Sequence, residues 1–284
     1  MRAKNPSALP PASQHGLKDA WKASGYFLAC ACYPEGDLEA GPVGSDVRTR
    51  VEISALDRLS DSVLRVGLVS ASPFAYHAGQ YLTLLREDGL ARSYSIASLP
   101  GAHEMELHVR MYPGGRMSQW LATSAGIGAT LQIHGPSGDC FYVPGREDQP
   151  LVLAGTGTGL APLYGIARAA LRAAHRGPIH LFHGATSPAG LYLQAELSEL
   201  AARHSIFIYT PTVLDADGPI ERVLLGSYPS MAGRRAYLCG DPVVVRSLRK
   251  AIFLAGAALN DIHADAFLPS ASPDTAPPVH SGVV

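Results

Sequence analysis

The sequence contains few of the residues that several common protein classes require. Cysteine occurs four times in 284 residues, at Cys30, Cys32, Cys140 and Cys239, which is too few and too scattered for a disulfide framework. Lysine plus arginine number 23 and aspartate plus glutamate 24, so the net charge is −1, and the basic surface that nucleic-acid binding needs is lacking. We therefore expect reduced thiols, a cytoplasmic location and no nucleic-acid partner.

Long apolar runs and hydrolytic motifs are also missing. No stretch of about 18 uncharged apolar residues occurs, so the sequence predicts no transmembrane helix and no membrane partner. The apolar run over residues 25–32 is too short, and starts too late, for a signal-peptide core. The chain has no G-x-S-x-G elbow, and its eleven histidines form no H-E-x-x-H or H-x-x-x-H zinc pattern.

What the sequence does contain indicates two folded domains. Its length fits about two domains of ~100–200 residues. Short β-type runs separated by glycine and proline turns predict a closed antiparallel barrel of about six strands in residues 45–147. These runs are Val47–Leu56, Ser62–Val69, Gln80–Leu85, Arg92–Ala97, Glu104–Met111 and Thr130–His134, with one short helix over Ser118–Ser124.

From Pro150 onward, short apolar runs alternate with helical patterns. This alternation predicts a parallel sheet covered on both faces, in an α/β domain over residues 148–268. The expected strands are Leu151–Ala154, Pro178–Phe182, Ser205–Tyr209, Arg235–Cys239 and Asp261–Ala266, and the expected helices Ala161–His175, Leu191–Arg203 and Val243–Ala257. Residues 1–44 read as a separate fragment with a linker over Tyr33–Gly44, and residues 269–284 as a disordered tail.

A glycine-rich loop, Gly155-Thr156-Gly157-Thr158-Gly159, follows the first buried strand of the second domain and precedes a helix. Its glycines let a phosphate approach the backbone, and the helix N-terminus favours an anion. The spacing is neither the Rossmann nor the Walker A pattern, and a purely structural turn is the alternative. Cys239-Gly240-Asp241-Pro242 ends a later strand, where α/β sheets bind ligands. A plain core cysteine is the alternative there.

The barrel region carries two further motifs. Arg92, Tyr94 and Ile96 fall on one strand face and Ser93, Ser95 and Ala97 on the other. A cation beside a flat aromatic suits a phosphate-bearing ring ligand, although an incidental pair on an amphipathic strand would look the same. His108-Val109-Arg110 leads into Gly115-Arg116-Met117-Ser118, a turn and helix start that either binds a second phosphate or is simply capped by Ser118.

These motifs together, in this order, resemble the ferredoxin–NADP reductase superfamily over about residues 46–268. The chain is most similar to the reductase components of bacterial multicomponent (aromatic-ring) oxygenases. The resemblance implies that Tyr94 packs on a flavin, that Ser95 lies near its N5 atom, and that Arg92 meets its phosphates. The segment 115–118 resembles a pyrophosphate segment and favours FAD over FMN. Gly135-Pro136-Ser137-Gly138 resembles the turn that closes the barrel.

The resemblance also assigns the second domain. The segment Gly155–Pro162 resembles the dinucleotide pyrophosphate loop, Cys239 would border the nicotinamide, and Phe267 matches a terminal aromatic beside the flavin. We expect Ser95 and Cys239 to be catalytic and no residue to bind a metal. The expected cofactor-binding residues are Arg92, Ser93, Tyr94, Ser95, His108, Arg110, Gly115, Arg116, Met117, Ser118, Gly155, Thr156, Gly157, Thr158, Gly159, Cys239, Gly240, Asp241, Pro242 and Phe267.

The N-terminal segment is similar to the end of a plant-type [2Fe–2S] ferredoxin domain, with Leu28-Ala29-Cys30 in the place of the fourth ligand. Such a cluster needs four thiolates, and only Cys30 matches one, so a cluster is not expected in this chain. In that family the third cysteine lies about thirty residues earlier, which here falls just before Met1. A mis-called start and a real loss of the cluster both fit, and an in-frame C-x4-C-x2-C upstream of Met1 would decide for the first.

The expected function is an FAD-dependent NAD(P)H oxidoreductase that passes electrons to an iron–sulfur carrier or an oxygenase component. NADH is favoured over NADPH, because the segment His183–Pro188 after the second sheet strand has no arginine for a 2′-phosphate. Two alternatives remain open. One is a stand-alone NAD(P)H:flavin or quinone reductase, and the other is a non-catalytic pseudo-reductase subunit.

Overall fold

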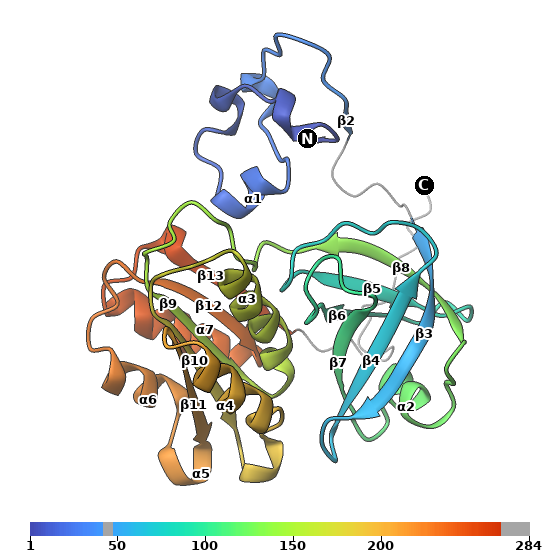
Figure 1. Ribbon diagram of the computed structural model, residues 1–284, viewed down its shortest axis with the longest axis vertical. Helices are drawn as coiled ribbons and strands as arrows, with labels where there is room; N and C mark the ends of the chain where they lie inside the picture. The colour runs from blue at the N-terminus through green and yellow to red at the C-terminus, as the bar shows by residue number, and fades with distance from the viewer. Residues whose placement is uncertain (42–47, 268–284) are drawn as a thin grey trace, which may run out of the picture.

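The computed structural model describes residues 1–41 and 48–267, and these form a small N-terminal segment, a β-barrel and an α/β domain (Figure 1). Part of the predicted linker (42–44) and the predicted tail (269–284) lie outside the described residues. Among the described residues, no helix is both long and apolar enough to cross a membrane.

The first sheet has six antiparallel strands in the order β6-β5-β8-β3-β4-β7, as the sequence predicts. An isolated bridge between Ile96 and Leu107 joins its two edge strands, which closes the barrel. Inward residues of β3, β4, β5, β7 and β8 are buried in one core, to which helix α2 adds Met117 and Leu121, while Tyr94 of β6 packs partly buried against it. The bounds are β3 Arg48–Arg58, β4 Val63–Ser70, β5 Tyr81–Leu85, β6 Ala91–Ser95, β7 Met105–Arg110, β8 Thr130–Ser137 and α2 Arg116–Thr123.

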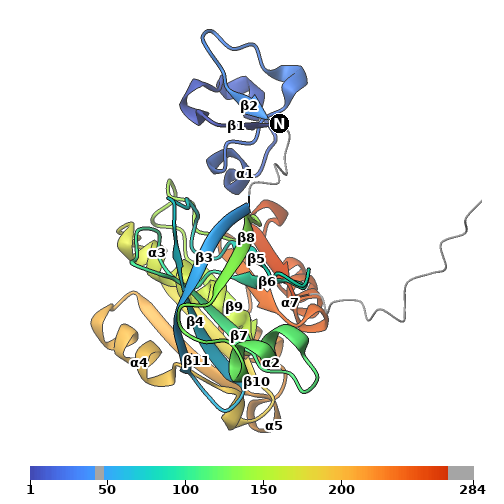
Figure 2. The ribbon, with the colours of Figure 1, turned by 90° about the vertical axis from the view of Figure 1, so that its right-hand side faces the viewer.

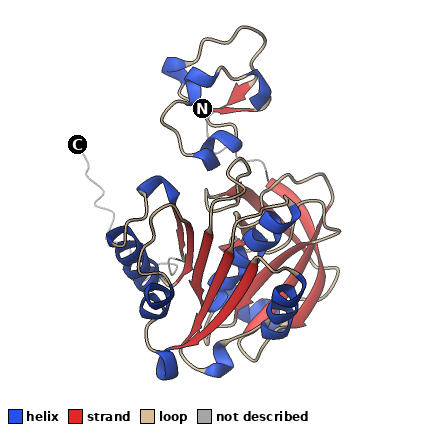
Figure 3. Ribbon diagram, turned by 60° about the vertical axis from the view of Figure 1, so that its left-hand side comes forward, coloured by secondary structure: helices blue, strands red, loops and turns tan. Residues whose placement is uncertain are grey.

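The second sheet has five strands in the order β11-β10-β9-β12-β13, and all of its pairs are parallel. Helices α3 and α4 pack on one face and α6 and α7 on the other, an arrangement seen in Figure 3. The strands are β9 Leu151–Thr156, β10 Ile179–Ala185, β11 Phe207–Val213, β12 Arg235–Gly240 and β13 Ile262–Ala266. The helices are α3 Leu160–Arg172, α4 Gln194–Arg203, α5 Leu214–Asp217, α6 Ile220–Ser227 and α7 Pro242–Leu254, with 3-10 turns η4 Gly157–Gly159, η5 Pro188–Gly190 and η6 Leu259–Asp261.

The sequence pattern missed three helices, α1 (Asp19–Ala23), α5 and α6, and placed the starts of α2 and α4 two and three residues away from the observed positions. Helices α5 and α6 were not predicted, because they are short and α6 contains Gly226. The helix predicted from Leu191 begins at Gln194, since Leu193 has a left-handed backbone (φ 56°). Strand β11 continues through Pro211, which is tolerated because β11 is an edge strand.

The N-terminal segment folds as a small unit beside the other two domains, and Figures 1 and 2 both show it at one end of the molecule. Ion pairs join it to them. Lys18 Nζ lies 2.9 Å from Asp139 Oδ2, and Asp19 Oδ2 lies 3.1 Å from Arg146 and 3.5 Å from Arg235. The elements are β1 Arg2–Ala3, η1 Pro6–Ala8, η2 Pro11–Gln14, α1 Asp19–Ala23, η3 Ala29–Ala31 and β2 Ala40–Gly41.

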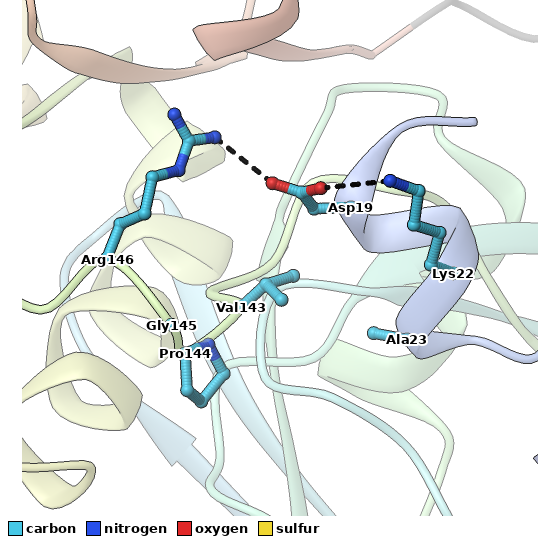
Figure 4. A pocket seen from close by; sticks show the side chains of 7 residues that line it. All are labelled: Asp19, Lys22, Ala23, Val143, Pro144, Gly145 and Arg146. Atoms are coloured by element: carbon cyan, nitrogen blue, oxygen red, sulfur yellow. Dashed lines mark hydrogen bonds and ion pairs between the residues drawn. The ribbon is translucent and has the colours of Figure 1, made fainter. Parts of the chain in front are cut away.

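A pocket lies where this segment meets the stretch of chain that leads from the barrel into the second sheet (Figure 4). It is lined by α1 residues on one side and by residues 143–146 on the other, with Asp19 bridging Arg146 and Lys22. The segment therefore packs on the connection between the two larger domains.

Candidate functional site

The two domains meet at the end of strand β6. The Ser95 hydroxyl, on the last residue of β6, donates a 3.4 Å hydrogen bond to Oδ2 of Asp265 on β13. Cys239, the last residue but one of β12, pairs in register with Asp265. The fold therefore brings the two predicted catalytic residues, Ser95 and Cys239, to one place and adds a carboxyl group between them.

Burial changes the proton affinity of this group of side chains. Burial raises the pKa of Asp265 to about 6, although the hydrogen bond from Ser95 acts in the opposite direction. Burial also raises the pKa of Cys239, whose sulfur lies 3.6 Å from that of Cys140. At neutral pH the Cys239 side chain is thus a neutral thiol, while Asp265 titrates in the range where a group can exchange protons with a bound ligand.

Sequence reasoning missed Asp265. The residue lies two positions before Phe267 in the last strand, in the run Ile-His-Ala-Asp-Ala. A carboxylate inside a strand of a parallel sheet is unusual, because both faces of such a sheet are covered. The sequence alone could therefore show that Asp265 is unusual. It could not show that Asp265 bonds Ser95, which lies 170 positions away.

The glycine-rich loop follows β9 and forms the 3-10 turn η4 before α3. A Cβ atom on Gly155 would lie 2.6 Å from the Cys239 carbonyl oxygen, and one on Gly159 would collide with that same oxygen. Gly157 has a φ of +54°, and a Cβ there would lie 3.4 Å from an Arg110 nitrogen. Two glycines thus allow the loop to pack on β12, while the third faces the barrel.

Helix α3 begins directly after this loop, and its N-terminus has no side-chain cap, since the N-cap residue is Gly159. The first backbone N–H groups of a helix have no intrahelical partner, so an uncapped start suits a phosphate. Pro162 lies in the first turn of the helix, where its missing N–H costs nothing. These features fit a dinucleotide pyrophosphate.

The barrel offers two cations to a second anionic ligand. Arg92 on β6 and Arg110 on β7 form no ion pair with a carboxylate of residues 1–41 or 48–267. Arg92 donates to the neighbouring Ala91 carbonyl (2.7 Å), and Arg110 lies over the Tyr112 ring. The Tyr94 ring on β6 is half-buried beside the barrel core. A guanidinium without an acidic partner, next to an aromatic ring, fits the phosphate and ring system of a flavin.

Several predicted site residues have other partners in this structure. Ser93 is exposed and shares a 2.9 Å hydrogen bond with Thr83, while Asp241 caps α7 by accepting from Val243 and Val244. Met117 is buried in the barrel core. Their roles in cofactor binding stay predictions.

Four further predicted residues, Phe267, Ser118, Arg116 and His108, also have partners within the protein. The Phe267 amide donates a 2.9 Å hydrogen bond to the carbonyl of Gly240, next to Cys239. Ser118 Oγ accepts from the Tyr112 amide and donates to the Gly115 carbonyl, so it holds the start of α2. Arg116 forms a 3.5 Å ion pair with Asp88. The ring of His108 is buried, and both of its nitrogens have partners, Glu106 and Tyr192.

A barrel with two available arginines, joined to an α/β sheet with a phosphate loop, defines a flavin- and pyridine-nucleotide-binding oxidoreductase. Known protein families agree with this class. Residues 51–142 match the oxidoreductase FAD-binding domain and residues 153–250 the oxidoreductase NAD-binding domain. The chain belongs to this family of ferredoxin reductase-like flavoenzymes.

Relatives of known role cover most of the chain. The ferredoxin–NAD(P)+ reductase component of the Pseudomonas putida naphthalene 1,2-dioxygenase system is 35% identical over 86% of this chain and 78% of its own. The reductase subunit of an Amycolatopsis aromatic O-demethylase is 36% identical over 88% and 80%. A solved Amycolatopsis cytochrome P450 reductase superposes with a TM-score of 0.74 at 32% identity, over 88% of this chain and 80% of its own.

Proposed function

We propose that this enzyme oxidises NADH at a bound FAD and delivers the electrons to an iron–sulfur protein or an oxygenase component. The observation that carries the proposal is the meeting of Ser95, Cys239 and Asp265 at the boundary between a barrel and a dinucleotide-type sheet. The Pseudomonas putida relative, a reductase component of the naphthalene 1,2-dioxygenase system, supports the kind of partner.

The chain's own residues have separate tasks in this reaction. When bound, FAD would supply the redox chemistry that links the two-electron oxidation of the reduced nicotinamide to the reduction of the acceptor. Arg92, Tyr94 and Ser95 would hold the flavin, and the 155–159 loop would hold the dinucleotide. Asp265, with its raised pKa of about 6, would exchange a proton through the Ser95 hydroxyl. The neutral Cys239 thiol would border the nicotinamide without competing as a nucleophile.

The preference for NADH rests on charge near the carboxyl ends of β10 and β11. The segment after β10, residues 183–188, has no arginine. Asp215 and Asp217 follow β11 in α5, and both lie in the first turn of that helix. Carboxylates there would repel a 2′-phosphate, whereas the 2′-hydroxyl of NADH could donate a hydrogen bond to them.

In this proposal the chain itself holds no iron–sulfur cluster. Cys30 is exposed and Cys32 partly exposed, and only Cys30 matches a ligand position of the plant-type pattern, which needs four thiolates. We also propose that the N-terminal segment is related to the end of a ferredoxin domain. Iron analysis of the purified protein tests whether the chain holds a cluster, and the expected result is FAD without stoichiometric iron.

Steady-state turnover with each donor tests the coenzyme preference. We expect kcat/KM with NADH to exceed that with NADPH by at least about tenfold, which corresponds to about 1.4 kcal/mol. Turnover should reach an added [2Fe–2S] protein. Equal use of both donors would contradict the assignment of NADH. Turnover with free flavins or quinones only, and none with any iron–sulfur protein, would favour a stand-alone reductase instead.

A further inference from the structure

Tyr192 forms a buried hydrogen-bonded link between the two domains that the hydride chemistry itself does not use. Its side chain is 2% exposed, and its hydroxyl lies 3.0 Å from Nδ1 of His108 on β7 of the barrel. The other nitrogen of His108 lies 2.8 Å from Oε1 of Glu106. The polar groups of Tyr192, His108 and Glu106 are thus hydrogen-bonded to one another inside the protein. This link favours one placement of the α/β domain relative to the barrel.

The backbone next to Tyr192 has an uncommon conformation. Leu193, the following residue, has φ 56° and ψ 26°, in the left-handed region. A large aliphatic side chain adopts that region only at a cost in free energy, so the surrounding contacts must hold it there. This bend separates the buried Leu191 and Tyr192 from helix α4, which starts at the next residue.

Tyr192 also contacts His183, a residue of strand β10 that lies beside the phosphate loop. Its ring packs edge-to-face on His183 of β10, with ring centres 5.4 Å apart and planes at 89°. His183 is fully buried and pairs in register with Gly155, the first glycine of the loop. Neither of its ring nitrogens has a hydrogen bond of normal geometry in the described part of the chain, but the backbone of Gly157 in the loop acts on the ring and partly offsets the burial that lowers its pKa to about 4.

Two sets of contacts therefore connect strand β7 to the phosphate loop. Arg110, two residues after His108, lies against Gly157 directly. His108 reaches the loop through Tyr192 and then His183. The direct contact is made by an exposed side chain, whereas the second route is buried throughout.

We propose that Tyr192 is a positioning residue: its hydroxyl, bonded to His108, fixes the phosphate loop relative to the barrel so that a bound dinucleotide faces the flavin. This inference rests on the proposed function. Small errors of placement are costly in hydride transfer, since about 1 Å of misplacement can reduce a rate by about 10²-fold.

The test compares Tyr192→Phe with Tyr209→Phe. Tyr209 lies on β11 of the same domain, and its hydroxyl is also buried but has no partner among the residues described. For Y192F we expect the dissociation constant of NAD+, measured by calorimetry, to rise about threefold or more. We also expect faster amide hydrogen exchange in residues 155–160 and a single-turnover rate of flavin reduction about fivefold or more below wild type. The FAD content and the rate of reduction by dithionite should not change.

A double-mutant cycle with His108→Asn checks that the link acts as a unit. If Tyr192 and His108 act together, the double variant should lose little more NAD+ affinity and reduction rate than Y192F alone. The inference would be overturned if Y192F kept the NAD+ affinity, loop exchange and reduction rate of the wild type. It would also be overturned if Y209F lost as much NAD+ affinity and reduction rate as Y192F. These outcomes are distinct from a failure of the proposed function, in which the wild-type protein itself would take up no flavin or would not be reduced by NADH.

Discussion

Asp265 is a carboxyl group at a largely buried position, where its oxygen accepts a hydrogen bond from Ser95 across the boundary between the domains. Its folded-state pKa of about 6 lies above the ordinary value of 3.8. The folded protein therefore binds this proton more tightly than the unfolded chain does. The stabilising effect of that proton is complete below about pH 4 and is lost as the pH rises through 6.

Replacing Asp265 by asparagine should remove this pH dependence. In urea unfolding at pH 8, we expect Asp265→Asn to be more stable than wild type by about 2–3 kcal/mol, since one pKa unit corresponds to about 1.36 kcal/mol. The difference should vanish below about pH 4. Asp215→Asn, at an exposed aspartate, is the control and should change little. A wild-type protein that is stabilised on going from pH 4 to pH 8 relative to D265N would contradict the raised pKa.

At the scale of elements, the glycine loop and strand β12 must approach each other closely. A Cβ on Gly159 would collide with the carbonyl of Cys239. We expect Gly159→Ala to weaken NAD+ binding about tenfold and to lower the free energy of unfolding by roughly 1–3 kcal/mol.

The control for the loop is Gly226→Ala. Gly226 is an exposed residue of α6, and a Cβ added there would have no atom within 4 Å beyond its own helix backbone and chain neighbours. Alanine there should be neutral or stabilising by up to about 1 kcal/mol. Calorimetry with NAD+ and urea unfolding measure both variants. Unchanged binding in G159A would show that the loop tolerates a side chain at that position, contrary to the structure.

Ion pairs attach helix α1 to the rest of the protein. Asp19 faces Arg146 and Arg235, and although burial acts to raise the pKa of Asp19, these arginines lower it overall. Arg235 is 3% exposed, so its charge needs a partner. We expect Asp19→Asn to increase the rate of proteolysis within residues 1–41 several-fold without loss of FAD.

The matched control for Asp19 is Lys4→Gln. Lys4 pairs with Glu39 in the same segment, with both side chains more than 70% exposed, and such pairs contribute little. Limited proteolysis followed by mass spectrometry separates the two variants. If both were cleaved at the wild-type rate, the ion pairs of α1 would not be what attaches the segment.

For the whole molecule, local patterns were enough to predict the architecture. Short β-type runs between glycine and proline turns predicted the barrel strands, and strand–helix alternation predicted the parallel sheet, because both depend on neighbours in sequence. The loop at 155–159 and Ser95 were chosen from local motifs too, and their roles in cofactor binding stay predictions. Asp265, Tyr192 and His183 were not found as site residues, since what distinguishes them is contact with residues far away in the chain.

If the two domains form one site for FAD and NADH, anaerobic reduction of the purified protein will show it. The chain is loaded with FAD and mixed with NADH without oxygen, and the visible absorbance of the flavin is followed with a [2Fe–2S] protein added afterwards. We expect NADH to bleach the flavin and the iron–sulfur protein to restore its colour. A chain that takes up no FAD, or whose FAD stays oxidised in excess NADH, would contradict it.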